Sequence, residues 1–201
     1  MIGTGFKGNI KPHVSSSGQV TQSSEEEHKV TLDYLMSKPR GFLKPYWPII
    51  NETVSWIFSE LPQRQGMATD FSEARKAGKN SKEYDNAVSS IRALSIEHLN
   101  SSLEASGTEI GKPALFQLIT NEILGMSILD PIWDDKRVHE VYVNGPYDIQ
   151  VEMDDGLHRV NGASFENQRH ALSFCTKLLG DYNKSLDVST NPIAESRLDD
   201  G

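Results

Sequence analysis

The sequence predicts an α+β fold in which a helical amino-terminal region precedes a small antiparallel sheet with flanking helices. Before residue 125, apolar residues recur at the spacing of a helix in three separate stretches. After Val138 the spacing changes to the alternation that is typical of strands. Two turn-forming pairs, Asn144-Gly145 and Asp155-Gly156, interrupt that alternation and predict hairpins.

The amino-terminal end has a different composition from the rest of the chain. Residues 1 to about 30 are rich in Gly, Ser and Gln and end in the acidic run Glu25–Glu27. Such a segment buries too little apolar surface to offset its ordering entropy. We therefore expect a disordered tail over residues 1–40, a helical region over 41–106 and a second domain over 107–201.

Three helices are expected before the sheet. The first follows Pro48 and ends at Leu61, where Pro62 stops it. Residues 63–80 are polar and contain two glycines, which predicts a loop. The second helix starts at Ser81, and the third covers 114–124 after Pro113, with Gly125 as its cap.

The sheet is expected to have three short strands followed by one helix. Val141 and Val143 belong to the first strand, and Ile149 and Val151 belong to the second. The third strand and the last helix are expected at these ranges: 157–160 and 166–179. Residues 129–133 are expected to fill the space between the third helix and the sheet, and residues 186–201 to be extended.

Composition excludes several classes of function. The 201 residues carry a formal charge of -8, which disfavours direct binding to nucleic acid or to an anionic membrane. Cys175 is the sole cysteine, so the chain forms no internal disulfide and has no CxxC metal motif. The start of the chain lacks the pattern of a signal peptide, and no apolar stretch is long enough to span a bilayer. These features predict a cytoplasmic setting.

The sequence contains no complete catalytic motif. Gly3 and Gly8 have the spacing of a phosphate-binding loop, but Asn9 replaces the required lysine. Gly111-Lys112 has the lysine, but Pro113 replaces the Ser or Thr that would bind magnesium. None of the six histidines forms an i,i+4 pair, and there is no GxSxG motif. We expect this chain to be inactive by itself.

Five motifs from Asn121 to Gly201 follow one recognisable order. They are, in order, Asn121-Glu122-Ile123-Leu124-Gly125; Ile128-Leu129-Asp130-Pro131-Ile132; Val138-His139-Glu140-Val141-Tyr142-Val143-Asn144-Gly145-Pro146; Ile149 to Glu152 with Asp155-Gly156; and Pro192 to Gly201. This order resembles the amino-terminal domain of the CpaF-like type II/type IV secretion ATPases, which serve Tad pili, type IV secretion and conjugation. The resemblance covers roughly 80 of the 201 residues and none of the first 105 or so.

The resemblance implies a role in a motor. In that family two domains clamp ATP, six identical subunits form a ring, and the second domain holds the phosphates and magnesium. It implies for this chain a non-catalytic amino-terminal part that ends before the phosphate-binding loop. It also implies a peripheral position at the cytoplasmic side of the inner membrane, where the ring acts on a secretion or pilus platform protein.

The resemblance also assigns roles to individual residues. Arg197, in Ser196-Arg197-Leu198-Asp199-Asp200-Gly201, corresponds to a family arginine that approaches the nucleotide phosphates. The alternative is a surface arginine paired with Asp199 or Asp200. Lys184 is the nearest base to the position of a second family arginine. Asn144, Gly145, Asp200 and Gly201 belong to the motifs that define the structure.

Two further hypotheses stay open. The chain could be an adaptor that lacks a motor domain and docks into an ATPase ring. It could also be a membrane-proximal interaction module centred on the aromatic stretch Phe42–Leu61, although that stretch is short and lacks basic flanks.

Overall fold

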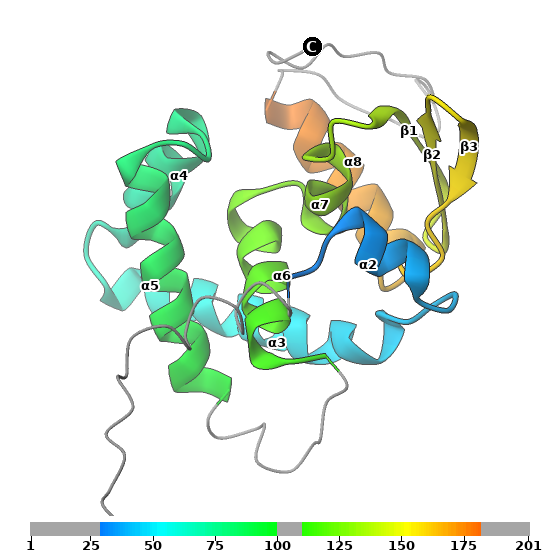
Figure 1. Ribbon diagram of the computed structural model, residues 1–201. Helices are drawn as coiled ribbons and strands as arrows, with labels where there is room; N and C mark the ends of the chain where they lie inside the picture. Colours follow the sequence, from blue (N-terminus) through cyan, green and yellow to red (C-terminus); the bar gives the residue numbers. More distant parts are fainter. Residues whose placement is uncertain (1–28, 100–109, 182–201) are drawn as a thin grey trace, which may run out of the picture.

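The computed structural model describes residues 29–99 and 110–181, and for residues 179–181 it describes the backbone alone. Its architecture confirms the predicted α+β class (Figure 1). The elements are α2 (Leu32–Ser37), η1 (Lys44–Tyr46), α3 (Trp47–Glu60), η2 (Leu61–Gln63), α4 (Met67–Ala77), α5 (Lys82–Leu99), α6 (Lys112–Leu124), η4 (Ser127–Leu129), α7 (Asp130–Trp133), β1 (Val138–Gly145), β2 (Asp148–Met153), β3 (Gly156–Arg159) and α8 (Gln168–Asp181).

The expected disordered tail is wrong for residues 29–40. Thr31 caps α2 by accepting the backbone N–H of Tyr34, and Leu32 and Leu35 are fully buried. Val30 is buried as well. This short apolar run comes soon after the acidic run Glu25–Glu27. The polar composition before it led the sequence analysis to include it in the disordered tail. Residues 1–28 lie outside the described part of the chain.

The loop expected over residues 63–80 is also wrong, because most of it forms α4. Phe71 and Ala74 are buried on one face of this helix, which packs against α5. Gly66 and Gly78, which suggested a loop, lie just outside the helix at its two ends with positive φ. The two glycines mark the ends of a helix rather than the interior of a loop.

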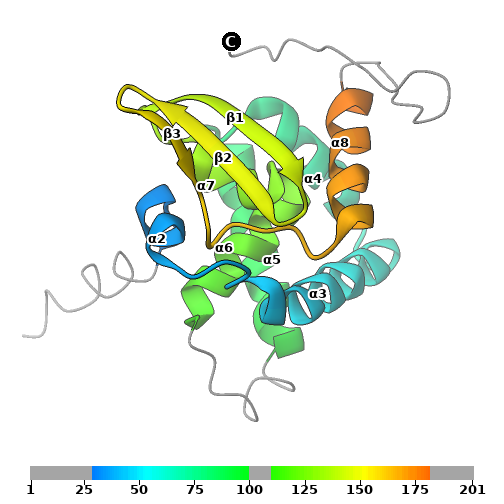
Figure 2. The same ribbon diagram turned by 90° about the vertical axis from the view of Figure 1, so that its right-hand side faces the viewer.

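The sheet is a meander of three antiparallel strands in the order β1-β2-β3. Val141 lies opposite Val151, and Val151 lies opposite His158, so these three residues share the face that carries the buried Val151. The opposite face carries Tyr142 and Glu152 and is exposed. In Figure 2 the sheet is seen between α2 and α8.

The first hairpin turns two residues later than the sequence suggested. Asn144 and Gly145 belong to β1, Gly145 pairs with Asp148, and the turn consists of Pro146 and Tyr147. Neither Asn144 nor Gly145 has positive φ. Proline presets the φ of the first central turn position and cannot donate to the ladder, so the turn falls on Pro146.

The second hairpin is displaced by one residue. Its turn is Asp154-Asp155, and Gly156, with φ +119°, starts β3.

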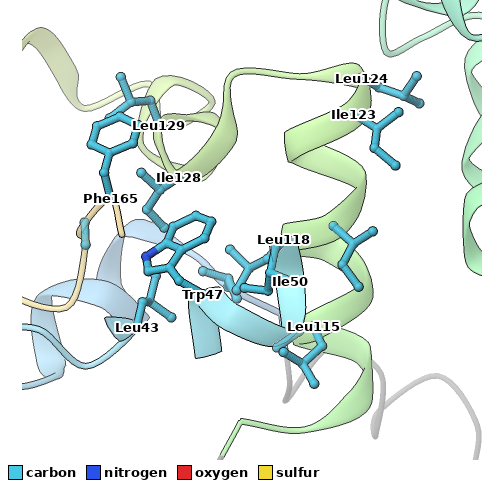
Figure 3. Packing of buried hydrophobic residues seen from close by; sticks show 14 of the residues in the cluster. Leu43, Trp47, Ile50, Leu115, Leu118, Ile123, Leu124, Ile128, Leu129 and Phe165 are labelled. Atoms are coloured by element: carbon cyan, nitrogen blue, oxygen red, sulfur yellow. The ribbon is translucent and has the colours of Figure 1, made fainter. Parts of the chain in front are cut away.

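One hydrophobic core connects the helices with the sheet (Figure 3). Trp47 and Ile50 of α3 lie beside Leu118 of α6, and Phe165 lies beside Leu129 in the same cluster. Trp47 Nε1 donates to the carbonyl of Ser164 at 2.8 Å, which ties α3 to the segment after β3. Residues 129–132 are buried between α6 and the sheet, as expected, with Ile132 0% exposed. Trp133, which was expected to fill the same space, is 41% exposed.

Candidate functional site

Most of the residues that sequence analysis proposed as a site lie outside the described part of the chain, so their arrangement stays a prediction. Arg197, Lys184, Asp200 and Gly201 lie outside the described residues. Asn144 and Gly145 lie at the end of β1, where Asn144 is exposed and a Cβ on Gly145 would meet open space. Nothing at Gly145 therefore requires glycine, contrary to the interpretation of the pair as a tight turn.

An ion pair between a buried carboxylate and a partly exposed lysine lies where α7 meets the α4–α5 connection. Asp130, at the start of α7, is 3% exposed, and its Oδ1 lies 2.8 Å from Lys79 Nζ. Lys79 also contacts Asp134 at 2.7 Å. We call Lys79, Asp130 and Asp134 the lysine–aspartate cluster. Sequence analysis missed it because Lys79 follows Gly78 in the stretch interpreted as a loop.

Backbone groups hold Asp130 in place. The backbone N–H of Met126 donates to Asp130 Oδ2 at 2.9 Å. A Cβ on Gly125 would lie 1.8 Å from the same oxygen, so Asp130 fits here because residue 125 has no side chain. The Gly125 and Asp130 of the sequence motifs thus form one packing unit.

Burial and charge act in opposite directions on this cluster. Burial raises the pKa of Asp130, and the hydrogen bond and charge of Lys79 oppose that rise without cancelling it. Burial lowers the pKa of Lys79, but its hydrogen bonds to Asp130 and Asp134 raise it more. Burial, followed by the charge of Asp130, raises the pKa of nearby Tyr84. Lys79 therefore stays charged and supports a carboxylate that has little contact with water.

A second polar cluster joins α6, η4 and α8. Glu122 Oε2 lies 3.3 Å from His170 Nε2, and both side chains are 14% exposed. Ser127 Oγ donates to the other oxygen of Glu122. His170 Nδ1 accepts the backbone N–H of Glu166, so the neutral ring carries its proton on Nε2 and donates it to Glu122.

This Glu122 cluster is not arranged for nucleophilic catalysis. In a catalytic triad the histidine lies between the nucleophile and the acid. Here the carboxylate of Glu122 lies between Ser127 and His170, so the histidine cannot take the serine proton. Ser127 has φ +57°, and its bond to Glu122 helps to hold that uncommon backbone conformation. The cluster therefore has a structural role, because it connects α6 with η4 and α8 through hydrogen bonds.

A hollow lies between α5 and α6. It has a volume of about 450 Å³. Its lining residues are Lys29, Lys79, Tyr84, Asp85, Val88, Arg92, Pro113, Phe116, Gln117, Thr120, Asn121 and Asp134. A smaller hollow of about 180 Å³ adjoins it and shares Lys29, Gln117 and Asp134. The lining of the larger hollow mixes apolar and polar side chains.

The structure gives no support to a metal site among the described residues. His139 and His158 lie on the two outer strands and contact Asp154 and Asp155 at 2.7 and 2.8 Å. No group of three or more His, Cys, Asp or Glu side chains in the described ranges could hold a metal ion. Cys175 is half-buried, and burial raises the pKa of its thiol, which fits a packing role.

Comparisons with known proteins identify no family. No protein-family model matches the chain, and no curated protein matches it. The resemblance of residues 121–201 to secretion ATPases therefore stays a prediction. Within residues 29–99 and 110–181, no helix combines the length and the apolar character needed to cross a membrane.

Proposed function

We propose that this chain is the amino-terminal, non-catalytic part of a hexameric secretion ATPase of the type II/type IV traffic family. In this proposal identical subunits form a ring that powers secretion, pilus assembly or conjugation. The ring acts from the cytoplasmic side on a platform protein of the inner membrane. The observation that carries the proposal is the order of five motifs between Asn121 and Gly201.

The fold of the motif region supports the proposal. The described motifs follow one another as the end of α6, the segment η4–α7 and the first hairpin. Gly125 and Asp130 come from two different motifs and pack directly on each other. Likewise, Pro146 of the third motif forms the hairpin turn, and its carbonyl accepts the backbone N–H of Phe165 at 2.8 Å. The likeness thus involves residues that determine the backbone of one unit.

The proposal assigns ATP and magnesium mainly to a second domain. The described residues offer no set of side chains for a metal ion, so the proposal gives them no magnesium ligand. When bound, ATP supplies the free energy of hydrolysis. The role proposed for this chain is to bring the guanidinium of Arg197 toward the phosphates, where its forked donors match the phosphate oxygens.

The first test is to read the coding DNA past the codon for Gly201. The proposal expects the frame to continue into a strand followed by GxxxxGK[ST]. The protein from that longer frame is then compared with its Arg197→Ala variant, and turnover should fall about 10³- to 10⁵-fold. Arg169→Ala, which changes an exposed arginine on α8, is the matched control and should leave turnover unchanged.

Other outcomes separate the alternatives. A frame that continues without a phosphate-binding loop contradicts the ATPase proposal. A stop codon directly after Gly201 contradicts it too and favours the adaptor, provided that the chain co-purifies with a hexameric ATPase. Unchanged turnover in Arg197→Ala contradicts the role proposed for that arginine. The ATPase proposal itself is then decided by whether the frame contains the phosphate-binding loop.

A further inference from the structure

Two basic side chains converge on the turn of the first hairpin. Arg40 and Lys44 lie in the connection between α2 and α3, and both are exposed. Arg40 Nε donates to the carbonyl of Tyr147 at 3.3 Å, and Lys44 Nζ lies 5.5 Å from the centre of the Tyr147 ring. Tyr147 is itself held in place, because its hydroxyl donates to the carbonyl of Glu166 at 2.8 Å. We call Arg40 and Lys44 the basic patch.

The basic patch has no acidic partner in the described part of the chain. Within residues 29–99 and 110–181, neither Arg40 nor Lys44 forms an ion pair with a carboxylate. Asp148, the carboxylate that follows Tyr147 in the chain, is paired with Arg159 at 3.3 Å. The bond from Nε leaves the two terminal nitrogens of Arg40 as donors, and such a fork matches the two oxygens of a carboxylate.

A small hollow between α4 and α5 carries the opposite charge. Its volume is about 190 Å³, and it is lined by Asp70, Glu73, Glu83, Asn86, Ala87 and Ser90. No described basic side chain lines it, and its three carboxylates form no ion pairs with described residues. Ala87 is 2% exposed and provides an apolar surface for the stem of a lysine or arginine. We call this the acidic hollow.

The basic patch and the acidic hollow lie on opposite sides of the molecule. Figure 1 shows α4 at the left and the connection between α2 and α3 at the right. The two charged surfaces therefore cannot meet within one chain. They can meet between two copies, where each surface supplies the charge that the other lacks.

We propose that the basic patch of one chain binds the acidic hollow of a second copy. In this contact the terminal nitrogens of Arg40 donate to carboxylates of the hollow, and Lys44 adds its charge beside them. Because two different surfaces meet, the contact is head-to-tail, and its repetition closes a ring or extends a chain. The inference rests on the two charged surfaces and holds whether or not the chain belongs to a motor.

Charge reversal on each surface tests the contact in the full chain. The patch variant carries Arg40→Glu with Lys44→Glu, and the hollow variant carries Glu73→Lys with Glu83→Lys. Sedimentation equilibrium at low salt, with protein up to millimolar concentration, measures association. We expect the parent chain to associate. Each variant alone should associate at least about tenfold more weakly, because like charges then face each other.

An equimolar mixture of the two variants separates a direct contact from a loss of folding. The intact surfaces then face each other, and so do the two reversed surfaces, so association should return to the level of the parent. The control variant, Lys136→Glu with Arg169→Glu, changes the net charge as much as the patch variant does, at exposed residues outside both surfaces. It should associate like the parent.

The proposal is overturned if the parent chain stays monomeric at millimolar concentration. It is also overturned if the mixture fails to recover association, or if the control loses association as the patch variant does. A monomeric parent that binds phosphatidylserine vesicles through Arg40 and Lys44 would assign the basic patch to a lipid surface instead. None of these results depends on the coding frame after Gly201, which decides the proposed function separately.

Discussion

Among the described glycines, Gly125 is the one at which an added Cβ would come closest to another atom. A methyl group there would lie 1.8 Å from Asp130 Oδ2 and would push that carboxylate away from the N–H of Met126. We expect Gly125→Ala to reduce the free energy of unfolding by about 1–3 kcal/mol. Urea denaturation measures this, and Gly145→Ala is the control because a Cβ at that position meets open space.

Equal effects of Gly125→Ala and Gly145→Ala would contradict this account. The control is also informative by itself. The sequence interpretation placed Gly145 at a turn position with positive φ, and alanine would be strained there. In the structure Gly145 lacks positive φ, so its replacement by alanine should be nearly neutral.

Lys79 stabilises a carboxylate that burial disfavours. Replacing Lys79 by Met leaves Asp130 without its cation, and we expect the free energy of unfolding at pH 8 to fall by about 1–3 kcal/mol. This loss is smaller than that for a fully buried pair, because Lys79 is partly exposed to solvent. The pKa of Asp130 is already raised by burial, and the loss of Lys79 raises it further.

This loss has a defined pH dependence. A carboxyl whose folded pKa lies above its unfolded pKa binds more protons in the folded state, so its contribution to stability falls as pH rises through the folded pKa. In Lys79→Met that decline extends to higher pH than in the parent chain. The difference between the two proteins, measured by urea denaturation, should therefore be smaller at pH 5 than at pH 8. A difference that is constant with pH would show that Asp130 is not the group involved.

Single side chains of the candidate site were hard to predict from sequence because their partners are far away in the chain. Glu122 and His170 are 48 positions apart, and Lys79 and Asp134 are 55 positions apart. Asp130 carried one local signal, its place beside a proline at the start of a helix. Nothing local indicates that this carboxylate is buried, because its burial depends on Gly125 and on a lysine from another element.

Helix α4 shows where periodicity failed at the scale of an element. Its composition is polar and two glycines flank it, and the loop prediction was based on that composition. The helical spacing of its few apolar residues was not taken into account. Phe71 and Ala74 are three positions apart and share the buried face. The longer helices were predicted well because each carries four or more apolar positions at helical spacing.

Phe71 should therefore contribute strongly to stability. It is 3% exposed between α4 and its neighbours, and we expect Phe71→Ala to cost about 3–5 kcal/mol. Phe58 is 47% exposed on α3, so Phe58→Ala should cost less than about 1 kcal/mol. Thermal unfolding followed by circular dichroism compares them. If the two variants melt at the same temperature, α4 does not pack as described.

At the scale of the whole molecule, the helical region and the sheet share one core. The core cluster includes Trp47 and Leu94 as well as Ile149 and Phe165. Hydrogen bonds cross the same border, including Gly41 N–H to the carbonyl of Asn161 and Gly162 N–H to the carbonyl of Leu35. The sequence predicted the order of the parts, but it carried no signal for these long-range contacts.

We therefore expect a fragment of residues 107–201 to lack a cooperative unfolding transition when it is produced alone. Its helix α6 packs on α3 and α5 in the full chain and would expose that face in the fragment. Residues 29–201 should retain a single transition with the same midpoint by tryptophan fluorescence and by circular dichroism. A fragment 107–201 that unfolds cooperatively would show that the two ranges fold independently.

The close contact at Gly162 has a consequence for tracing the ancestry of this protein. A Cβ at residue 162 would lie 2.5 Å from the carbonyl oxygen of Leu35, and one at residue 125 would collide with Asp130. Descendants of a common ancestor with this fold are therefore expected to keep glycine at both positions and an acid at 130, even where their surfaces have diverged. A Cβ at Gly145 of the Asn144-Gly145 pair would meet open space, so this glycine can be replaced by other residues. Distant kinship is thus better recognised by the two crowded glycines than by the hairpin motif.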